Sequence, residues 1–148
     1  MKSTYQTLRM KDKEIKKHLS YLKMASEWSQ NSCCRRKKVG ALIVKDQMII
    51  SDGYNGTPIG FSNDCEDPNG DTYWYVLHAE ANAITKLAKS TQGAQGSTLY
   101  VTLSPCKECS KLIIQTGIKT VIYKEEYRDL SGLKILKESG IQIIQLDY

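Results

Sequence analysis

The chain has 148 residues, of which 41% are hydrophobic and 25% are charged, a balance typical of a globular protein. At this length we expect one domain over residues 1–148, which should bury roughly 70% of the surface of the unfolded chain without disulfide support. The longest aliphatic run is too short for a signal-peptide core or a membrane span, so secretion and membrane insertion are disfavoured. The net charge of +5 is modest but concentrated in the first part of the chain, which favours an anionic ligand near that basic segment and does not distinguish a nucleotide from a polymer.

The first half of the chain predicts a helix, a strand pair and a loop. Apolar residues recur at helical spacing over 12–30, with lysines on the opposite face. Apolar runs at 39–44 and 48–51 flank a short turn, which indicates an antiparallel hairpin buried on both faces. Residues 52–75 are rich in Gly, Asn, Asp and Pro, and a stretch of this length without regular structure predicts a functional loop.

The second half alternates helices with strands. The predicted elements are a helix over 77–89, a strand over 98–103, a helix from Pro105 to Gly117, a strand over 118–123, a helix over 131–139 and a strand over 141–146. This order predicts an α/β fold, a three-layer αβα sandwich around a mixed five-stranded sheet with parallel pairing among the later strands. Ligands of such sheets bind beyond the carboxyl ends of the strands, where helices begin.

Four residues with metal and acid–base chemistry lie at the starts of two predicted helices. His78 and Glu80 begin one helix, and Cys106 and Cys109 begin the other. Cysteines three apart on a first helical turn face the same side, and the helix dipole favours their thiolates. Together with one imidazole they fill three tetrahedral positions of zinc and leave the fourth for water. Because two thiolates neutralise the metal charge, this water needs a base, which Glu80 supplies.

The remaining cysteines allow a different interpretation of the metal. Five cysteines are an odd number, and the Cys-x-x-Cys pair favours metal or redox chemistry over a disulfide framework, so we expect a reducing compartment. Cys33, Cys34 and Cys65 are expected to be core or bystander thiols. If Cys34 or Cys65 were a fourth ligand, the zinc would be structural and the protein a non-catalytic binding module.

The same residues carry a resemblance to a known family. His78-Ala-Glu80 with Pro105-Cys106-x-x-Cys109 is the signature of zinc nucleobase deaminases. The chain resembles the cytidine deaminase superfamily and, within it, the deoxycytidylate deaminases. That narrower resemblance rests on Cys34-Arg-Arg-Lys-Lys-Val-Gly-Ala, on Gly53-Tyr54-Asn55-Gly56 followed by Thr57-Pro58, and on Tyr100-Val-Thr-Leu-Ser-Pro-Cys.

The resemblance implies hydrolytic deamination of dCMP to dUMP, the precursor of thymidylate, by a cytoplasmic enzyme with one zinc ion per subunit. By the same resemblance Glu80 moves protons to the pyrimidine N3 and to the leaving ammonia. Asn55 is implied to contact the deoxyribose and Arg36 and Tyr127 the 5′-phosphate, with Ala79 also in the substrate site. Some relatives have a longer insertion and a second, structural zinc; residues 57–77 are shorter here and include only Cys65 as a possible ligand, so no second zinc is expected.

The resemblance also implies an assembly and its regulation. Many relatives are hexamers that dCTP activates and dTTP inhibits, with Mg²⁺ accompanying the effector. The residues implied for such an effector site are Gly53, Tyr54, Asn55 and Gly56. A homo-oligomer, preferably a hexamer, is therefore expected.

Several of these residues have a simpler structural interpretation. The basic run of residues 35–38 could be a solvated edge before a buried strand. Gly53 and Gly56 could serve a tight turn that needs positive φ, and Tyr127 could be a packed aromatic residue. His18 is expected on the solvent or partner face of the first helix, away from the metal. The rival function, deamination of a base in RNA or single-stranded DNA, would need a longer basic or aromatic groove than this chain offers.

Overall fold

The computed structural model describes residues 10–148, which form four helices and five strands. Every predicted element is present in the predicted order, with bounds within three residues of those expected. The elements are α1 (Asp12–Ser29), β1 (Gly40–Lys45), β2 (Met48–Tyr54), α2 (Ala79–Leu87), β3 (Thr98–Leu103), α3 (Lys107–Gln115), β4 (Thr120–Glu125), α4 (Ser131–Glu138) and β5 (Gln142–Gln145).

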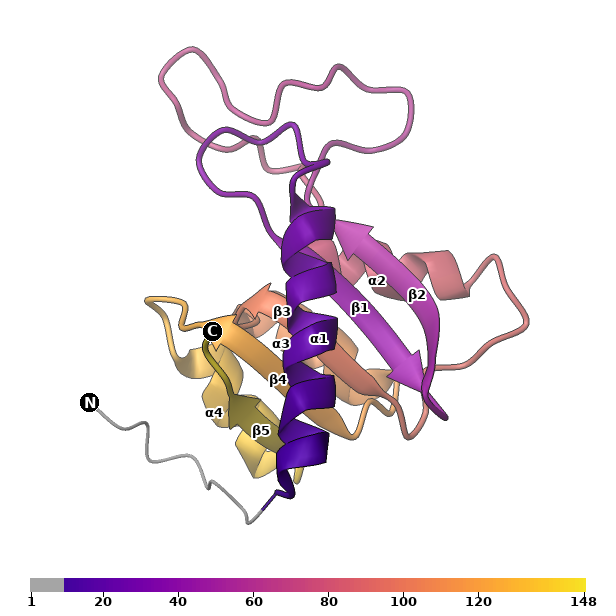
Figure 1. Ribbon diagram of the computed structural model, residues 1–148. Coiled ribbons are helices and arrows are strands. Elements are labelled where there is room, and N and C mark those ends of the chain that lie inside the picture. The colour runs from indigo at the N-terminus through magenta and orange to yellow at the C-terminus, as the bar shows by residue number, and fades with distance from the viewer. Residues whose placement is uncertain (1–9) are drawn as a thin grey trace.

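The strands form one mixed sheet in the order β2-β1-β3-β4-β5 (Figure 1). Strand β1 is antiparallel to both β2 and β3, whereas β4 is parallel to β3 and to β5. The parallel pairs follow from the helical crossovers α3 and α4, because a strand must return to the same end of the sheet before it can pair in parallel. The predicted mixed five-stranded sheet is confirmed.

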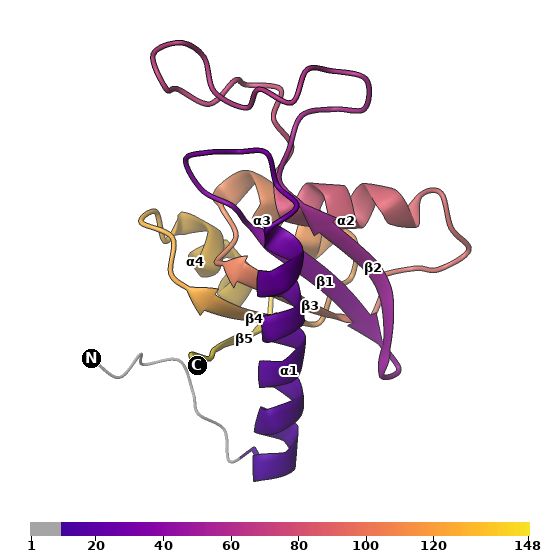
Figure 2. The same ribbon diagram turned by 45° about the horizontal axis from the view of Figure 1, so that its top comes forward.

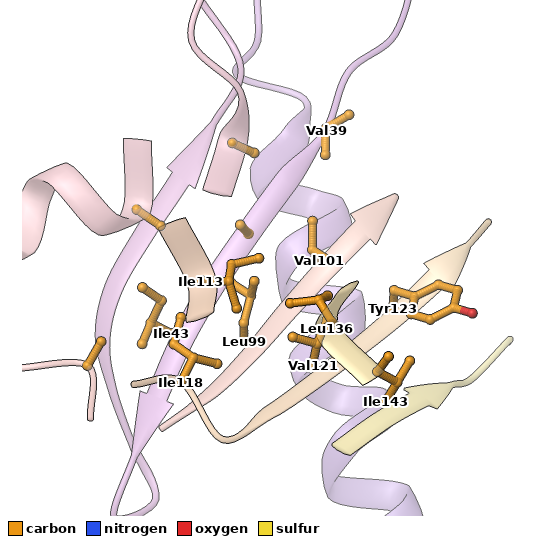
Figure 3. Packing of buried hydrophobic residues seen from close by; sticks show 14 of the residues in the cluster. Val39, Ile43, Leu99, Val101, Ile113, Ile118, Val121, Tyr123, Leu136 and Ile143 are labelled. Carbon is orange, nitrogen blue, oxygen red and sulfur yellow. The ribbon is translucent and has the colours of Figure 1, made fainter. Parts of the chain in front are cut away.

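The helices cover both faces of the sheet. Helix α1 crosses one face, where Leu22 and Ala25 pack against a cluster that includes Leu42, Tyr100 and Ile122 (Figures 1 and 2). Helices α2, α3 and α4 cover the other face over a larger buried cluster. Figure 3 shows this cluster, with side chains from β1, β3, β4, α3 and α4 directed toward one another. The three-layer αβα arrangement is therefore confirmed.

Burial of the hairpin follows the position of each strand in the sheet. Strand β1 lies between β2 and β3, and alternate residues along it enter the two clusters: Leu42 on the α1 side and Ile43 on the other. Strand β2 is an edge strand, and its first residues, Met48 and Ile49, are exposed. The prediction that the hairpin is buried on both faces is thus right for β1 and wrong for the start of β2.

The predicted functional loop corresponds to a long segment without helix or strand between β2 and α2, residues 55–78. We call this segment the projecting loop. In Figures 1 and 2 it extends beyond the end of the sheet, at the same end as the segment 30–39 between α1 and β1. Short backbone bridges stabilise it, between Gly56 and Leu77 at its base and between Glu66 and Thr72 farther out.

His18 lies differently from the sequence-based expectation. Its ring nitrogen Nδ1 is 2.7 Å from the hydroxyl oxygen of Tyr100 in β3, so the side chain faces the sheet and is half-buried. The predicted solvent or partner face is therefore wrong, whereas the predicted place away from the metal-binding residues is confirmed.

Over residues 10–148, no helix combines the length and the apolar character needed to cross a bilayer.

Candidate functional site

The site forms where strands end and helices begin. His78 is the N-cap residue of α2, and Cys106 is the N-cap residue of α3, three residues after the end of β3. Both cap residues have extended backbone conformations and are not yet helical. The chain therefore enters α2 and α3 from the loops that follow β2 and β3, at the carboxyl ends of these strands. This is the edge at which the sequence predicted the ligand site.

Three side chains meet there with ligand atoms suited to a metal. The Nδ1 atom of His78 lies 3.4 Å from Sγ of Cys106 and 3.4 Å from Sγ of Cys109. All three ligand atoms lie within 4.8 Å of one another, and no fourth His, Cys, Asp or Glu joins them among residues 10–148. Tetrahedral zinc with typical bond lengths separates a nitrogen and a sulfur ligand by about 3.6 Å. The three residues therefore fit a zinc ion and leave one tetrahedral position open.

The local hydrogen bonds favour a thiolate at this place. Hydrogen bonding from the Cys109 side chain lowers the pKa of Cys106 to about 4, although burial opposes this shift. The backbone N–H of Cys109 also donates to Sγ of Cys106, at 3.4 Å. The hydrogen bond with Cys106 raises the pKa of His78 above its ordinary value. A thiolate is the metal-binding form of cysteine, so Cys106 is prepared to act as a ligand.

Glu80 lies in the first turn of α2, with only 4% of its surface exposed. Burial is the main cause that raises the pKa of this carboxyl group. A carboxyl group with a raised pKa holds and releases protons closer to neutral pH, which suits a general acid and base.

Two glycines allow the backbones of neighbouring elements to pack closely beside the site. A Cβ atom on Gly53 would lie 2.4 Å from the Ala79 carbonyl oxygen and 2.7 Å from the Ala83 nitrogen, both in the backbone of α2. A Cβ atom on Gly132 of α4 would lie 2.2 Å from the carbonyl oxygen of Pro105. Gly53 and Gly56 do not have positive φ, so the tight-turn interpretation is wrong for both. Glycine is needed at position 53 because the backbone of α2 packs so closely on β2 that no Cβ atom fits between them.

A cavity of about 620 Å³ opens onto the metal-binding residues. It brings His78, Cys106 and Glu80 together with all of the predicted substrate residues, whereas the buried Cys109 is not part of its lining. Its lining includes His78, Glu80 and Cys106 together with Arg36, Asn55, Ala79 and Tyr127. The predicted effector residues Gly53, Tyr54 and Gly56 are not among the residues that line this cavity.

The amide of Asn55 is already engaged with the backbone. Its Oδ1 accepts a hydrogen bond from the N–H of Val39 at 2.9 Å, and its Nδ2 donates to the carbonyl oxygen of Lys37 at 2.7 Å. Asn55 therefore holds the end of the basic segment beside the cavity. One N–H of its amide remains after these contacts.

Two of the cysteines are joined, which corrects an expectation. Cys34 and Cys65 form a disulfide across 31 positions of the sequence. Both residues are buried, as expected of core residues, but they are not free thiols and they do not join the metal cluster. The bond argues against the predicted reducing environment. Cys33 is free and exposed. Sequence spacing cannot reveal this pair, because only the fold brings the projecting loop beside segment 30–39.

The cations at the cavity differ in their partners. Lys37 forms a 2.6 Å ion pair with Glu125. Arg36 and Arg128 also line the cavity, and neither forms an ion pair with a carboxylate of residues 10–148. The Arg128 guanidinium carbon lies 5.9 Å from the centre of the Tyr127 ring. Positive charge at the cavity therefore remains available to an anionic ligand.

The lining also contains residues that no sequence-based prediction singled out for the site, among them Arg128, Ser104 and Glu66. Arg128 lies three residues after the end of β4 at Glu125, and a cation that follows the carboxyl end of a strand is a signal that the sequence offers. Ser104 is buried and accepts a hydrogen bond from the backbone N–H of Tyr127 at 2.7 Å, which joins the ends of β3 and β4. Glu66 is buried in the projecting loop and had no local signal, since no motif surrounds it.

Comparisons with known proteins agree with this geometry. The yeast (Saccharomyces cerevisiae) deoxycytidylate deaminase is 36% identical over 138 residues, covering 86% of this chain and 44% of the relative. The probable deoxycytidylate deaminase of Caenorhabditis elegans is 40% identical over 124 residues, covering 80% of this chain and 62% of the relative. The chain thus spans about half the length of these curated relatives.

A solved structure is similar over almost its full length. The dCMP deaminase of cyanophage S-TIM5, in complex with dCMP and dUMP, superposes with a TM-score of 0.86 at 47% identity and covers 93% of this chain and 99% of its own. Residues 15–125 match the family described as the cytidine and deoxycytidylate deaminase zinc-binding region. This match includes both halves of the metal-binding motif and most of the sheet, and the chain therefore belongs to the cytidine and deoxycytidylate deaminase family.

Proposed function

We propose that this protein converts dCMP to dUMP and ammonia by hydrolysis and so supplies dUMP for thymidylate synthesis. The observation that carries the proposal is the meeting of a buried acid, Glu80, with the cluster of His78, Cys106 and Cys109. The cavity beside this cluster is also lined by Arg36 and Arg128, which form no ion pair within residues 10–148. The similarity to the phage protein that was solved with dCMP and dUMP supports the choice of substrate.

In this proposal His78, Cys106 and Cys109 hold one zinc ion per subunit. When bound, zinc is a Lewis acid that lowers the pKa of water and so makes it a nucleophile at neutral pH. Glu80 accepts a proton from the water that attacks C4 of the pyrimidine and delivers it to N3. Glu80 then takes the proton of the new C4 hydroxyl and delivers it to the exocyclic amine, so that the C4–N bond breaks, ammonia leaves and the C4 carbonyl forms.

The substrate contacts use the groups that remain free in the cavity. Arg36 and Tyr127, which both line the cavity, contact the 5′-phosphate of the substrate. The remaining N–H of Asn55 donates to the deoxyribose. Ala79 follows the metal-binding His78, and its small side chain leaves room for the base. The cavity volume of about 620 Å³ lies in the range of small-molecule sites, which supports a free nucleotide rather than a polymer.

The assembly and its regulation are part of the same proposal. We propose that residues 1–148 act as one domain in a homo-oligomer, preferably a hexamer. Exposed Ile59, Phe61 and Trp74 on the projecting loop support association between copies. The effectors dCTP and dTTP, accompanied by Mg²⁺, are proposed to act at residues 53–56.

The proposed location is the cytoplasm, where free nucleotides are made and consumed. The Cys34–Cys65 disulfide argues against this, because cytoplasmic thiols are kept reduced. Thiol labelling of acid-quenched cells decides the point: a Cys34–Cys65 bond that is oxidised throughout the cellular protein would contradict a reducing location.

A deamination assay on zinc-loaded protein tests the function. Loss of ultraviolet absorbance is followed with dCMP, CMP, deoxycytidine, dCTP and a single-stranded DNA oligonucleotide, each with and without dCTP or dTTP and Mg²⁺. We expect turnover of dCMP above all others, raised by dCTP and suppressed by dTTP. Turnover of the oligonucleotide in preference to dCMP, or of none of the five compounds, would overturn the proposal.

A further inference from the structure

Glu66 is a buried carboxylate that the reaction itself does not use. Its residue is 5% exposed, it lies in the projecting loop, and it lines the cavity. Its Oε1 atom accepts hydrogen bonds from two successive backbone N–H groups, from Arg35 at 2.7 Å and from Arg36 at 2.9 Å. Its Oε2 atom lies 3.8 Å from Nε of Arg35. The carboxylate is thus directed at the backbone of the basic segment.

These contacts compensate for the burial of the charge. An ionised carboxylate without partners is costly to bury, whereas hydrogen bonds to a charged acceptor are roughly twice as strong as neutral ones. Two successive N–H groups that converge on one oxygen also fix the backbone direction at both residues. The position of Arg36 relative to the cavity therefore depends on Glu66.

Two further contacts hold the same segment from either side. The Cys34–Cys65 disulfide joins the residues that precede Arg35 and Glu66. Farther along, Asn55 bonds to the backbone of Lys37 and Val39. Arg36 lies between these two anchors, and its side chain forms no ion pair with the described residues 10–148. The backbone is thus constrained while the guanidinium stays available.

We propose that Glu66 is a positioning residue that directs Arg36 toward the phosphate of the substrate and so makes the site selective for a nucleotide over a nucleoside. The inference rests on the proposed function. Its physical basis is preorganisation: an arginine on a fixed backbone loses less conformational freedom when it binds an anion than one on a mobile segment.

The test compares KM and kcat for dCMP and deoxycytidine in three variants. Glu66→Ala removes the acceptor of both N–H groups, and we expect KM for dCMP to rise roughly tenfold, as the loss of a charge-assisted hydrogen bond predicts, with kcat and KM for deoxycytidine little changed. Glu66→Gln keeps an oxygen in the Oε1 position and should restore most of the affinity for dCMP. Arg35→Ala removes only the 3.8 Å ion pair and should resemble the wild type.

A direct measurement separates positioning from folding. Hydrogen exchange at the amides of Arg35 and Arg36 should be faster in Glu66→Ala than in Glu66→Gln, while the amides of β1 and β3 keep their protection. An equal rise of KM for dCMP and deoxycytidine in Glu66→Ala would overturn the inference. It would also be overturned if Glu66→Gln were as impaired as Glu66→Ala.

Calorimetric binding of dCMP and deoxycytidine distinguishes failure of this inference from failure of the proposed function. If the wild type binds dCMP more tightly than deoxycytidine but deaminates neither, the proposed function fails, and loss of that preference in Glu66→Ala still supports the positioning role. If the wild type shows no preference for dCMP over deoxycytidine in binding, the positioning role fails as well.

Discussion

Glu80 combines deep burial with a place beside the metal cluster, and its function depends on one ionisable oxygen. Glu80→Gln keeps the size and shape of the side chain but cannot transfer protons. We expect zinc to remain bound and turnover of dCMP to fall by about 10²–10⁴-fold or more, the usual contribution of general acid–base catalysis. Elemental analysis gives the zinc content and the ultraviolet assay the rate.

The matched control for Glu80→Gln is Glu108→Gln. Glu108 is an exposed carboxylate in the first turn of α3 that forms an ion pair with Lys111. This variant should retain both zinc and activity. Wild-type rates in Glu80→Gln would remove Glu80 from the proposed mechanism.

His18, which lies between α1 and the sheet, makes a pH-dependent contribution to the free energy of unfolding. Burial lowers the pKa of His18 below its ordinary value of 6.5, although nearby Glu14 opposes the shift. Between the lowered pKa and 6.5 the unfolded state binds more protons than the folded state, so the free energy of unfolding falls as the pH decreases through this window. The contribution is fully present above pH 6.5.

Urea unfolding at about pH 7.5 and about pH 5.5 measures this effect, since the two values bracket the ordinary histidine pKa. On acidification the wild type should lose more stability than His18→Gln, which has no ionisable group there. Because His78 is present in both proteins, it contributes to both measurements. An equal loss in the two proteins would show that His18 is not the titrating group.

At the scale of elements, the contact between β2 and α2 places Glu80 and His78. Gly53→Ala adds a methyl group 2.4 Å from the Ala79 carbonyl oxygen, and a helix backbone cannot yield as a flexible side chain does. We expect a loss of about 1–3 kcal/mol in the free energy of unfolding, typical of overpacking, and weaker zinc binding because α2 is displaced.

Gly56→Ala is the comparison for Gly53→Ala in unfolding experiments. Its added methyl group meets no atom within 4 Å, so the free energy of unfolding should change by less than about 0.5 kcal/mol. If the two variants were equally stable, the close approach of α2 to β2 would not be the reason for glycine at position 53.

The disulfide connects two elements of the site, the segment 30–39 and the projecting loop. Cys34 and Cys65 are 31 positions apart, and closing a loop of this length stabilises a folded protein by about 3–4 kcal/mol in the chain-entropy model. Reduction with a phosphine should lower the free energy of unfolding of the wild type by this order. The double variant Cys34→Ser/Cys65→Ser should not respond to the reductant, and a response of equal size there would assign the effect to another group.

At the scale of the whole molecule, the two hydrophobic clusters and the metal-binding residues are separate. The clusters lie on the faces of the sheet, whereas His78, Cys106 and Cys109 lie at its edge. Removal of zinc with a chelator should abolish activity, lower the midpoint of thermal unfolding and leave the far-ultraviolet circular dichroism nearly unchanged. Added zinc should restore the rate.

Zinc removal also distinguishes a catalytic zinc from a structural zinc. Small domains organised by a structural zinc unfold when the metal is removed. A chelated protein that lost its secondary structure would therefore favour a structural zinc over a catalytic one. Retained structure with lost activity is the outcome that the separation of core and site predicts.

The sequence by itself predicted the order of elements, the mixed sheet, the carboxyl edge as the place of the site, and the residues of the metal cluster. These features depend on short-range patterns. Apolar periodicity identifies strands and helices, and the spacing Cys106-x-x-Cys109 brings two side chains to the same side of one helical turn. His78 and Glu80 are close because they are two residues apart at the start of one helix. The meeting of the two helix starts also followed from fold class, because in such a sheet both lie at one edge.

Contacts between segments that are distant in the sequence are visible only in the folded structure. These are the Cys34–Cys65 disulfide, the bonds from Glu66 to the backbone of Arg35 and Arg36, and the packing of α2 on Gly53. No local sequence pattern predicts these contacts, because the residues around each partner do not indicate which distant segment will lie beside it. The physical reason is that periodicity and spacing report on neighbours along one element, whereas these contacts arise from the packing of separate elements.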